Sequence, residues 1–229
     1  MPYRLTRALA FPPAETADED GLVAVGGDLR PERLVLAYAS GIFPWPHQGY
    51  PLLWFSLDPR TVIPCDRVHV SRRLARTLRT RRFRVTLDTA FEDVIDGCAT
   101  VPRPGNPGTW ITPAMREAYV ALHRFGFAHS AECWREGRLV GGVYGVSVGA
   151  MFVGESMFTR VADASKVALV TLIRQIGRWG FPVLDAQMRT EHVARFGAED
   201  WPRSRYLGLL GECLERPTRL GPWALDPDL

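Results

Sequence analysis

Short runs rich in apolar residues, separated by turn residues, follow one another closely in the part of the chain that begins at Ala128. These runs predict strands over residues 128–134, 139–146 and 150–154. The first two are separated only by a tight turn at Glu136-Gly137, so they are expected to form an antiparallel hairpin. This segment therefore predicts a hairpin followed by a third strand.

A helix and one more strand follow. Apolar residues spaced i, i+3, i+4 and i+7 predict a helix after Ser165 that ends at Gly180. These residues are Leu169, Leu172, Ile173 and Ile176. The run Val183–Gln187 predicts a buried strand, and short helices complete the chain. A hairpin, a strand, a helix and a strand around one core indicate the α+β class.

The preceding segments are less regular. Pro31 opens a short helix, whereas the prolines of Gly41–Pro46 exclude a helix and predict an irregular aromatic loop. Thr112, followed by Pro113, opens a further helix that Gly126 closes. This first part therefore predicts short helices joined by loops.

A basic helix is predicted between Ser71, which can cap it, and about Thr80. Arg72, Arg76 and Arg79 recur on one face of it, and no acid occurs between residues 72 and 84. Regularly spaced guanidinium groups can follow the phosphates of a nucleic acid. A solvated basic face is the alternative, and the pattern alone leaves both open.

Three polar residues interrupt apolar stretches near the end of the chain. Glu155 lies in Gly154–Arg160, and Asp185 and Gln187 lie in Leu184–Gln187. Strand alternation places Asp185 and Gln187 on one face, away from Leu184 and Ala186. Because an unpaired buried polar group is unfavourable, these residues indicate either a site that handles an amine or a structural hydrogen-bond network.

Two tryptophans, Trp45 and Trp110, occur in predicted loops rather than on apolar stripes. A loop indole can stack on a base or an adenosine, which contributes about 1–3 kcal/mol. Packing into the core is the other interpretation.

Composition limits the possible functions. With 229 residues, 46% hydrophobic and 23% charged, the chain matches a soluble globular enzyme. We expect no signal peptide and no membrane span, because no apolar run is long enough. The four cysteines show no C-x-x-C pairing, which favours a reducing, cytoplasmic setting over a disulfide scaffold or zinc ribbon.

Common catalytic motifs are missing from the sequence. No G-x-S-x-G, Walker A or G-x-G-x-x-G pattern occurs. The histidines show no metal-ligand spacing, so no metal site is expected. A serine hydrolase, a phosphate-loop enzyme and a dinucleotide enzyme are therefore disfavoured.

Nine ordered segments resemble the bacterial leucyl/phenylalanyl-tRNA–protein transferases over nearly the whole chain. They are Gly21–Leu29, Gly41–Trp45, Asp58–Arg60, Gly108–Thr112, Ala128–Glu132, Gly141–Val146, Gly154–Arg160, Ala164–Lys166 and Leu184–Gln187. So many matches in order are specific, although none of them is specific alone.

The resemblance implies an enzyme that moves Leu, Phe or Met from its tRNA to a protein N-terminus bearing Arg or Lys, which marks that protein for N-degron degradation. It implies a small N-terminal domain (residues 1–65) followed by an acetyltransferase-like, GNAT-related domain (residues 66–229). It also implies a monomer, with no membrane partner and no cofactor, because the aminoacyl ester is already activated.

The resemblance also assigns roles to residues. Trp45 and Trp110 would flank the terminal adenosine, and the side-chain pocket would be lined by Phe152, Met157, Leu169 and Leu184. The tRNA acceptor stem would be held by Arg72, Arg76 and Arg79. The α-amine of the acceptor would be positioned by Glu155, Asp185 and Gln187.

The chemistry suggests how these last residues work. An α-ammonium has a pKa near 7.7–8.0, so part of the acceptor is already neutral at cytoplasmic pH. The hypothesis is that Asp185 polarises Gln187, whose carbonyl oxygen accepts a hydrogen bond from the attacking amine. Glu155 would add negative charge near the cationic acceptor residue. Which group removes the proton stays open.

The chain departs from the family pattern at Val143, where Met is expected, and at Ala186, where Cys is expected. Val143 is expected to reshape the amino-acid pocket, whereas Ala186 is expected to face away from the site. Thr80 replaces a basic residue of the pattern, and Arg81 and Arg82 can offset that loss.

Two other functions stay open. An acyl-CoA-dependent N-acetyltransferase would suit the C-terminal pattern, but Thr159–Ser165 lacks the glycines of a pyrophosphate turn. A non-enzymatic RNA-binding protein would use the arginines and tryptophans, but would leave Glu155, Asp185 and Gln187 unexplained.

Overall fold

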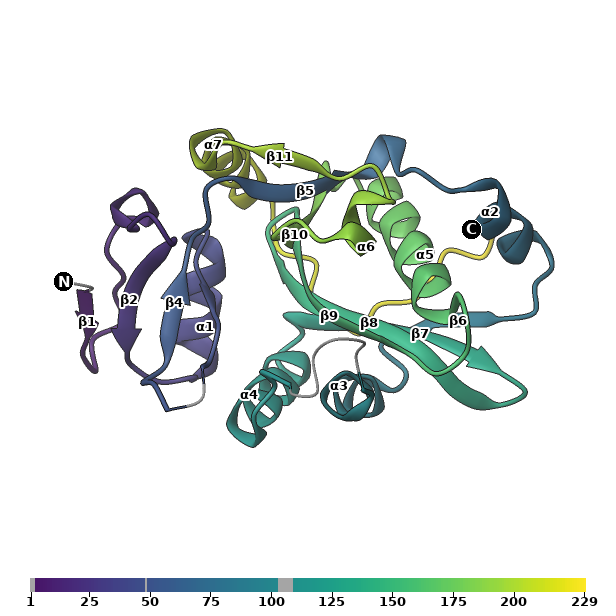
Figure 1. Cartoon of the computed structure of the whole chain (residues 1–229), viewed down its shortest axis with the longest axis horizontal. Coiled ribbons are helices and arrows are strands. Elements are labelled where there is room, and N and C mark those ends of the chain that lie inside the picture. Colours follow the sequence, from purple (N-terminus) through teal and green to yellow (C-terminus); the bar gives the residue numbers. More distant parts are fainter. Residues whose placement is uncertain (1–2, 48, 103–108) are drawn as a thin grey trace.

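Two β-sheets organise the protein (Figure 1). The computed structural model describes residues 3–47, 49–102 and 109–229, so Gly108, the first residue of one family-like segment, lies outside it. The smaller sheet has the order β1-β2-β4-β3. Its strands are β1 (Tyr3–Leu5), β2 (Leu22–Gly26), β4 (Leu53–Phe55) and β3 (Phe43–Pro44).

The larger sheet has the order β11-β5-β10-β9-β8-β7-β6. Its strands are β5 (Arg60–Pro64), β6 (Arg84–Leu87), β7 (Ala128–Arg135), β8 (Arg138–Val148), β9 (Met151–Thr159), β10 (Val183–Gln187) and β11 (Glu199–Trp201). The β9–β10 pair is parallel and the other pairs are antiparallel. The described part of the chain is therefore a mixed α/β protein, which agrees with the predicted α+β class at this level.

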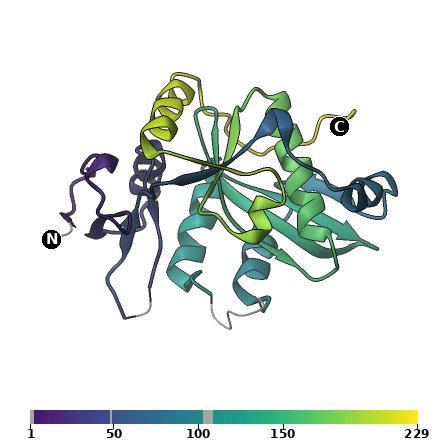
Figure 2. The same cartoon turned by 45° about the horizontal axis from the view of Figure 1, so that its top comes forward.

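Helices cover both faces of the larger sheet. The helices are α1 (Pro31–Ala39), α2 (Arg72–Arg79), α3 (Phe91–Thr100), α4 (Pro113–Arg124), α5 (Ala164–Arg178), α6 (Glu191–Ala194) and α7 (Arg203–Leu214), with 3-10 turns at Ala14–Thr16 and Cys65–Arg67. Helix α5 packs on one face, and α3 and α4 pack on the other (Figure 1). Figure 2 shows the small sheet at the end of the molecule that lies away from α2. No helix in the described ranges is long and apolar enough to cross a membrane.

Local signals in the sequence placed most elements correctly. The Ser71 hydroxyl accepts a hydrogen bond from the Leu74 N–H and caps α2, and Thr112 caps α4 in the same way. Helix α5 begins at Ala164, close to the expected start, and Gly180 follows it with a φ of 83°.

The strand expected over residues 150–154 is longer than predicted, because β9 continues through Glu155 to Thr159. The domain boundary at residue 65 stays a prediction. The strand β5, which precedes that boundary, pairs with β10 and β11 and so belongs to the larger sheet.

Two β-bulges lie on neighbouring strands. Where β9 pairs with β8, Ser156 faces Tyr144 and Gly154 faces Gly145, which leaves Glu155 as the additional residue. Gly145 is required at this position, because a Cβ atom there would lie 2.2 Å from the carbonyl oxygen of Val153. A bulge redirects the side chains around it, and here it changes the direction of Glu155.

The second bulge is in β10. Asp185 pairs with Val62 and Gln187 with Thr61, which leaves Ala186 as the additional residue. The parallel register between β9 and β10 pairs Phe152 with Leu184 and Val153 with Asp185. Glu155 and Ala186 therefore both lie just beyond the last pair that β9 and β10 form with each other, which is Val153 with Asp185.

Candidate active site

A cavity of about 930 Å³ lies where β9, β10, α5 and the aromatic loop of residues 43–47 meet. Its wall is mostly apolar, and its size falls within the range of small-molecule sites. Seven of the predicted site residues line it: Trp45, Trp110, Glu155, Met157, Leu169, Leu184 and Gln187. The structure thus brings together residues that are up to 142 positions apart in the chain (45 to 187).

Phe152 does not line the cavity. Its side chain is fully buried in the core next to α5, and its ring centroid lies 5.8 Å from that of Trp223. Phe152 pairs with Leu184, which does line the cavity, so it supports the wall from behind. The predicted contact with the substrate does not follow from this position.

Both departures from the family pattern, Val143 and Ala186, line the cavity. The expectation for Val143 agrees with its position. The expectation that Ala186 faces away from the site is wrong, because Ala186 shares the α5 side with Leu184, and that side forms part of the cavity wall. Leu184 and Ala186 do pack on the α5 side, as strand alternation predicted.

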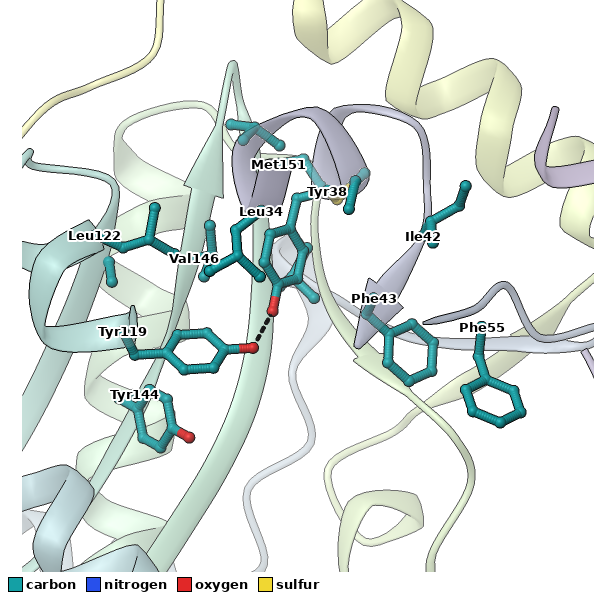
Figure 3. Packing of buried hydrophobic residues seen from close by; sticks show 14 of the residues in the cluster. Leu34, Tyr38, Ile42, Phe43, Phe55, Tyr119, Leu122, Tyr144, Val146 and Met151 are labelled. Carbon is teal, nitrogen blue, oxygen red and sulfur yellow. Dashed lines mark hydrogen bonds between the residues drawn. The ribbon is translucent and has the colours of Figure 1, made fainter. Parts of the chain in front are cut away.

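Among the described residues, the groups that donate hydrogen bonds to Glu155 are all neutral. The Tyr38 hydroxyl donates to Glu155 Oε1 (2.8 Å), and the Tyr119 hydroxyl donates to Oε2 (2.9 Å). The Gln187 side-chain amide also donates to Oε1, over 2.8 Å. The two tyrosine hydroxyls contact each other in the core between α1 and α4 (Figure 3).

Burial raises the pKa of Glu155 to about 7, although the hydrogen bonds from Tyr38, Tyr119 and Gln187 act in the opposite direction. The charge of Asp185 adds to the increase. Glu155 therefore exchanges its proton near neutral pH. Perturbed carboxyl groups of this kind are typical of functional sites.

Asp185 is fully buried and is paired with a charge. Its carboxylate accepts two short bonds from the Arg60 guanidinium, Nε to Oδ1 (2.9 Å) and Nη2 to Oδ2 (2.6 Å). The Tyr206 hydroxyl donates to Oδ2 (2.8 Å), and the Gln187 backbone N–H donates to Oδ1 (2.8 Å). Asp185 therefore does not reach the cavity.

Gln187 connects the two carboxyl groups. Its φ is 63°, a left-handed value that is uncommon outside glycine, and the Met188 N–H bonds to the Ala186 carbonyl (2.7 Å) across it. The bond from its own N–H to Asp185 holds this strained turn, and strain of this kind often occurs at functional sites. Among the described residues, none donates to its side-chain oxygen, and Gln187 lines the cavity.

The predicted connection from Asp185 to Gln187 runs through the Gln187 side chain. The structure shows that the connection runs through the Gln187 backbone N–H, while the Gln187 side chain bonds to Glu155. Asp185 thus positions the backbone of Gln187.

Four residues of the site were missed. Tyr38, Tyr119 and Tyr206 resemble ordinary apolar positions of helices, so their hydroxyl contacts could not be read from the periodicity. Arg60 did carry a signal, because it is a charged residue at the start of a buried strand.

Helix α2 lies apart from the cavity and packs on α5. Arg72, Arg76 and Arg79 are exposed, and none of the three takes part in an ion pair with a described residue. The nearby Arg73 and Arg82 lie 3.8 Å from Asp163, at the start of α5. Ser165, on the first turn of α5, lines the cavity, so this helix connects the two regions.

Within the described ranges, no group of three or more His, Cys, Asp or Glu side chains could hold a metal ion. Glu155 and Gln187 place a carboxyl group and an amide on the cavity wall, and the hydroxyls of Tyr38 and Tyr119 bond to Glu155 from the buried core.

Comparison with known proteins identifies the class of transferases. Residues 62–211 match the family model "Leucyl/phenylalanyl-tRNA protein transferase", and residues 27–58 match the model of its N-terminal domain. A leucyl/phenylalanyl-tRNA–protein transferase of Myxococcus xanthus is 58% identical over 95% of this chain and 94% of its own. One from Anaeromyxobacter is 56% identical over 98% of this chain and 95% of its own.

The chain belongs to the leucyl/phenylalanyl-tRNA–protein transferase family, and it is an aminoacyltransferase. This finding favours the transferase over the acetyl-CoA enzyme and the non-enzymatic RNA-binding protein.

Solved structures resemble the chain more distantly. A conserved protein of unknown function from Staphylococcus epidermidis has a TM-score of 0.45 and 11% identity, covering 79% of this chain and 68% of its own. The structure of L-PGS from Bacillus licheniformis has a TM-score of 0.37 and 12% identity, over 71% of this chain and 55% of its own.

Proposed function

We propose that the protein transfers Leu, Phe or Met from aminoacyl-tRNA to the N-terminal Arg or Lys of acceptor proteins. One observation supports this most directly: the apolar cavity ends at the Gln187–Glu155 pair, as a site for an apolar acyl group and an amine requires. The marked acceptor then enters N-degron degradation. Membership of the family supplies the two substrate classes.

The donor occupies the apolar part of the cavity. Trp45 and Trp110, both half-buried on its wall, flank the terminal adenosine. Met157, Leu169 and Leu184 surround the amino-acid side chain. Burying an apolar side chain of this size stabilises the complex by about 1.5–3 kcal/mol, so the wall selects for Leu, Phe and Met.

The acceptor amine approaches the polar end. Its nitrogen forms a bond to the ester carbonyl carbon, the bond from that carbon to the ribose oxygen breaks, and the amine loses a proton while the ribose oxygen gains one. Gln187 Oε1 accepts a hydrogen bond from the amine and aims it at the carbonyl.

Glu155 takes the amine proton in this scheme. Its pKa of about 7 supports the role, because a general base works best when its pKa is near the pH of the reaction. The ionised carboxyl group also favours a cationic Arg or Lys at the acceptor N-terminus.

The tRNA acceptor stem lies along α2 in this proposal. The exposed side chains of Arg72, Arg76 and Arg79 support it. Replacing Arg76 by Ala should weaken tRNA binding and reduce the salt slope of log K by about 1. An unchanged slope would return this helix to the role of a solvated face.

We also propose a small N-terminal domain over residues 1–65 and an acetyltransferase-like, GNAT-related domain over residues 66–229. The unit β9–α5–β10, two parallel strands joined by a helix, supports such a relation. A monomer in the cytoplasm completes the proposal, and no cofactor is needed because the aminoacyl ester is already activated.

The test is direct transfer of label. Purified protein is mixed with tRNA carrying [14C]phenylalanine and with a peptide that begins with Arg. The proposal expects label on the peptide N-terminus, whereas an identical peptide that begins with Glu should stay unlabelled. Label on neither peptide, with folded protein and intact Phe-tRNA, would overturn the proposal.

A further inference from the structure

Arg60 is the first residue of β5, and its side chain is only 1% exposed. A buried guanidinium is unfavourable unless its charge is paired and its N–H groups are bonded. Arg60 therefore needs partners, and the positions of those partners indicate what this residue does.

The guanidinium of Arg60 meets Asp185 as a two-pronged fork, through Nε and Nη2. Its third nitrogen, Nη1, points to the carbonyl oxygen of Gly41, 3.4 Å away. The guanidinium carbon lies 4.7 Å from the ring centroids of both Phe43 and Tyr206, which is within cation–π range. One charged group thus contacts β10, α7 and the aromatic loop.

The contact with Asp185 leads to the acceptor side of the cavity. Oδ1 of Asp185, which accepts from Arg60 Nε, also accepts a hydrogen bond from the Gln187 N–H and so holds the left-handed turn that aims the Gln187 side chain. Moving Asp185 would release this turn.

The contacts with Gly41 and Phe43 lead to the donor side. These residues precede Trp45 by four and two positions, and Phe43 and Trp45 both line the cavity. The prolines of this loop prevent a helix, and its first two residues instead form β3, which pairs with β4 on one side. Arg60 adds a second fixed point against which the loop packs.

We infer that Arg60 is a positioning residue that holds the Gln187 amide and the Trp45 ring in one arrangement, so that amine and aminoacyl ester meet correctly. The inference rests on the proposed function. It adds a coupling between the two substrates that runs through a buried group outside the cavity.

The geometry explains why arginine is needed. A lysine keeps the charge but has a single ammonium group. This group cannot donate two parallel hydrogen bonds to the Asp185 carboxylate and at the same time stack on the rings of Phe43 and Tyr206. A misplacement of about 1 Å in a reacting pair can reduce a rate roughly 100-fold.

The experiment compares Arg60→Lys with Arg33→Lys. Arg33 is a matched control, because it is also fully buried and paired with a carboxylate, Asp28 (3.3 Å), but its hydrogen bonds go to Thr6 and Asp28 rather than to Asp185 and Gly41. Arg60→Lys should lower single-turnover transfer at saturating Phe-tRNA roughly 100-fold and weaken Phe-tRNA binding roughly 10-fold. Arg33→Lys should change neither by more than about threefold.

Double-mutant cycles separate positioning from general damage. If Arg60 acts through Gln187, adding Arg60→Lys to the Gln187→Ala variant should lower its transfer rate by no more than about twofold. Likewise, adding Arg60→Lys to the Trp45→Ala variant should lower its affinity for Phe-tRNA by no more than about twofold. The inference would be overturned if the effects of the two single substitutions multiply in both double variants. A normal transfer rate in Arg60→Lys alone would also overturn it.

Failure of the proposed function gives a different result, since Gln187→Ala and Trp45→Ala would then themselves be without effect. If Arg60→Lys does not fold, Tyr206→Phe replaces it. This variant keeps the ring and loses the hydroxyl bond to Asp185, so transfer should fall roughly threefold to 10-fold, again without further loss in the Gln187→Ala background. An unchanged rate in Tyr206→Phe would then overturn the inference.

Discussion

Two carboxyl groups near the end of β10 are stabilised in different ways. Asp185 is paired with the positive charge of Arg60 and is enclosed completely. Glu155, on the neighbouring strand, accepts hydrogen bonds from neutral groups within the described part of the chain, those of Tyr38, Tyr119 and Gln187. Gln187 touches both groups, one through its backbone and one through its side chain.

The difference separates two tasks. A buried ion pair with bonds on every side holds its geometry, so Asp185 can fix the shape of the Gln187 turn. Glu155 accepts hydrogen bonds from neutral groups and forms no ion pair with a described residue, so burial raises its pKa to about 7. One group thus supplies position, and the other supplies a proton that can move at neutral pH.

The largest expected effect comes from Asp185→Asn. Removing one charge leaves the Arg60 guanidinium buried without its partner, which destabilises the fold by about 3–5 kcal/mol. Urea denaturation measures the loss. Glu155→Gln is the matched comparison, and we expect a loss of only about 1 kcal/mol there. Equal losses of unfolding free energy in Asp185→Asn and Glu155→Gln would show that the two carboxyl groups are not stabilised in different ways.

The next effect is on rate alone. Gln187→Ala keeps the backbone N–H that bonds to Asp185 and removes only the side-chain amide. Single-turnover transfer should fall roughly 100-fold, because the amine loses its orienting acceptor. Tm and tRNA affinity should stay close to those of the parent. A normal transfer rate would show that the amide does not position the amine.

Glu155→Gln should change the pH profile of transfer. In the parent, the rate rises through about pH 7 as Glu155 loses its proton, and rises again as the acceptor amine becomes neutral. The variant keeps only the second rise, and its rate at pH 7.5 is lower by about 10-fold or more. Rates at constant ionic strength between pH 5.5 and 8.5 measure this, and two identical profiles would assign the proton to another group.

The smallest effect is on stability against pH. Unfolded Glu155 releases its proton near pH 4.5, whereas the folded group keeps it up to about pH 7. The folded state therefore binds more protons between these values, so its free energy of unfolding falls as pH rises through this window. Glu155→Gln removes this slope. The Tm of Glu155→Gln minus that of the parent should therefore increase as the pH rises from 4.5 to 7. A Tm difference that stays constant over this range would contradict the raised pKa.

Elements governed by local signals could be predicted from the sequence. The cap at Ser71 and the apolar period of α5 depend on residues within one or two turns, and both elements occur where they were expected. The grouping of Glu155 with Gln187 also followed, because buried polar residues require partners.

Contacts between distant residues could not be predicted in the same way. Arg60 and Asp185 are 125 positions apart, and nothing in either segment identifies the other as its partner. Strand alternation assumes a regular strand, so it could not anticipate the bulge at Ala186 or the left-handed turn at Gln187. The hydroxyl of Tyr38 was hidden in a helix whose apolar pattern was already satisfied.

The paired bulges at Glu155 and Ala186 also have a consequence for how this chain can change in length. Each bulge is one residue more than the partner strand supplies, so deleting Ala186 would place Gln187 directly after Asp185, still opposite Thr61, in a regular strand. The left-handed turn that the bond from the Gln187 N–H to Asp185 holds would then be lost. Insertions and deletions should therefore be tolerated in the connecting loops but not in these two strands, where the site depends on the number of residues as much as on their identity.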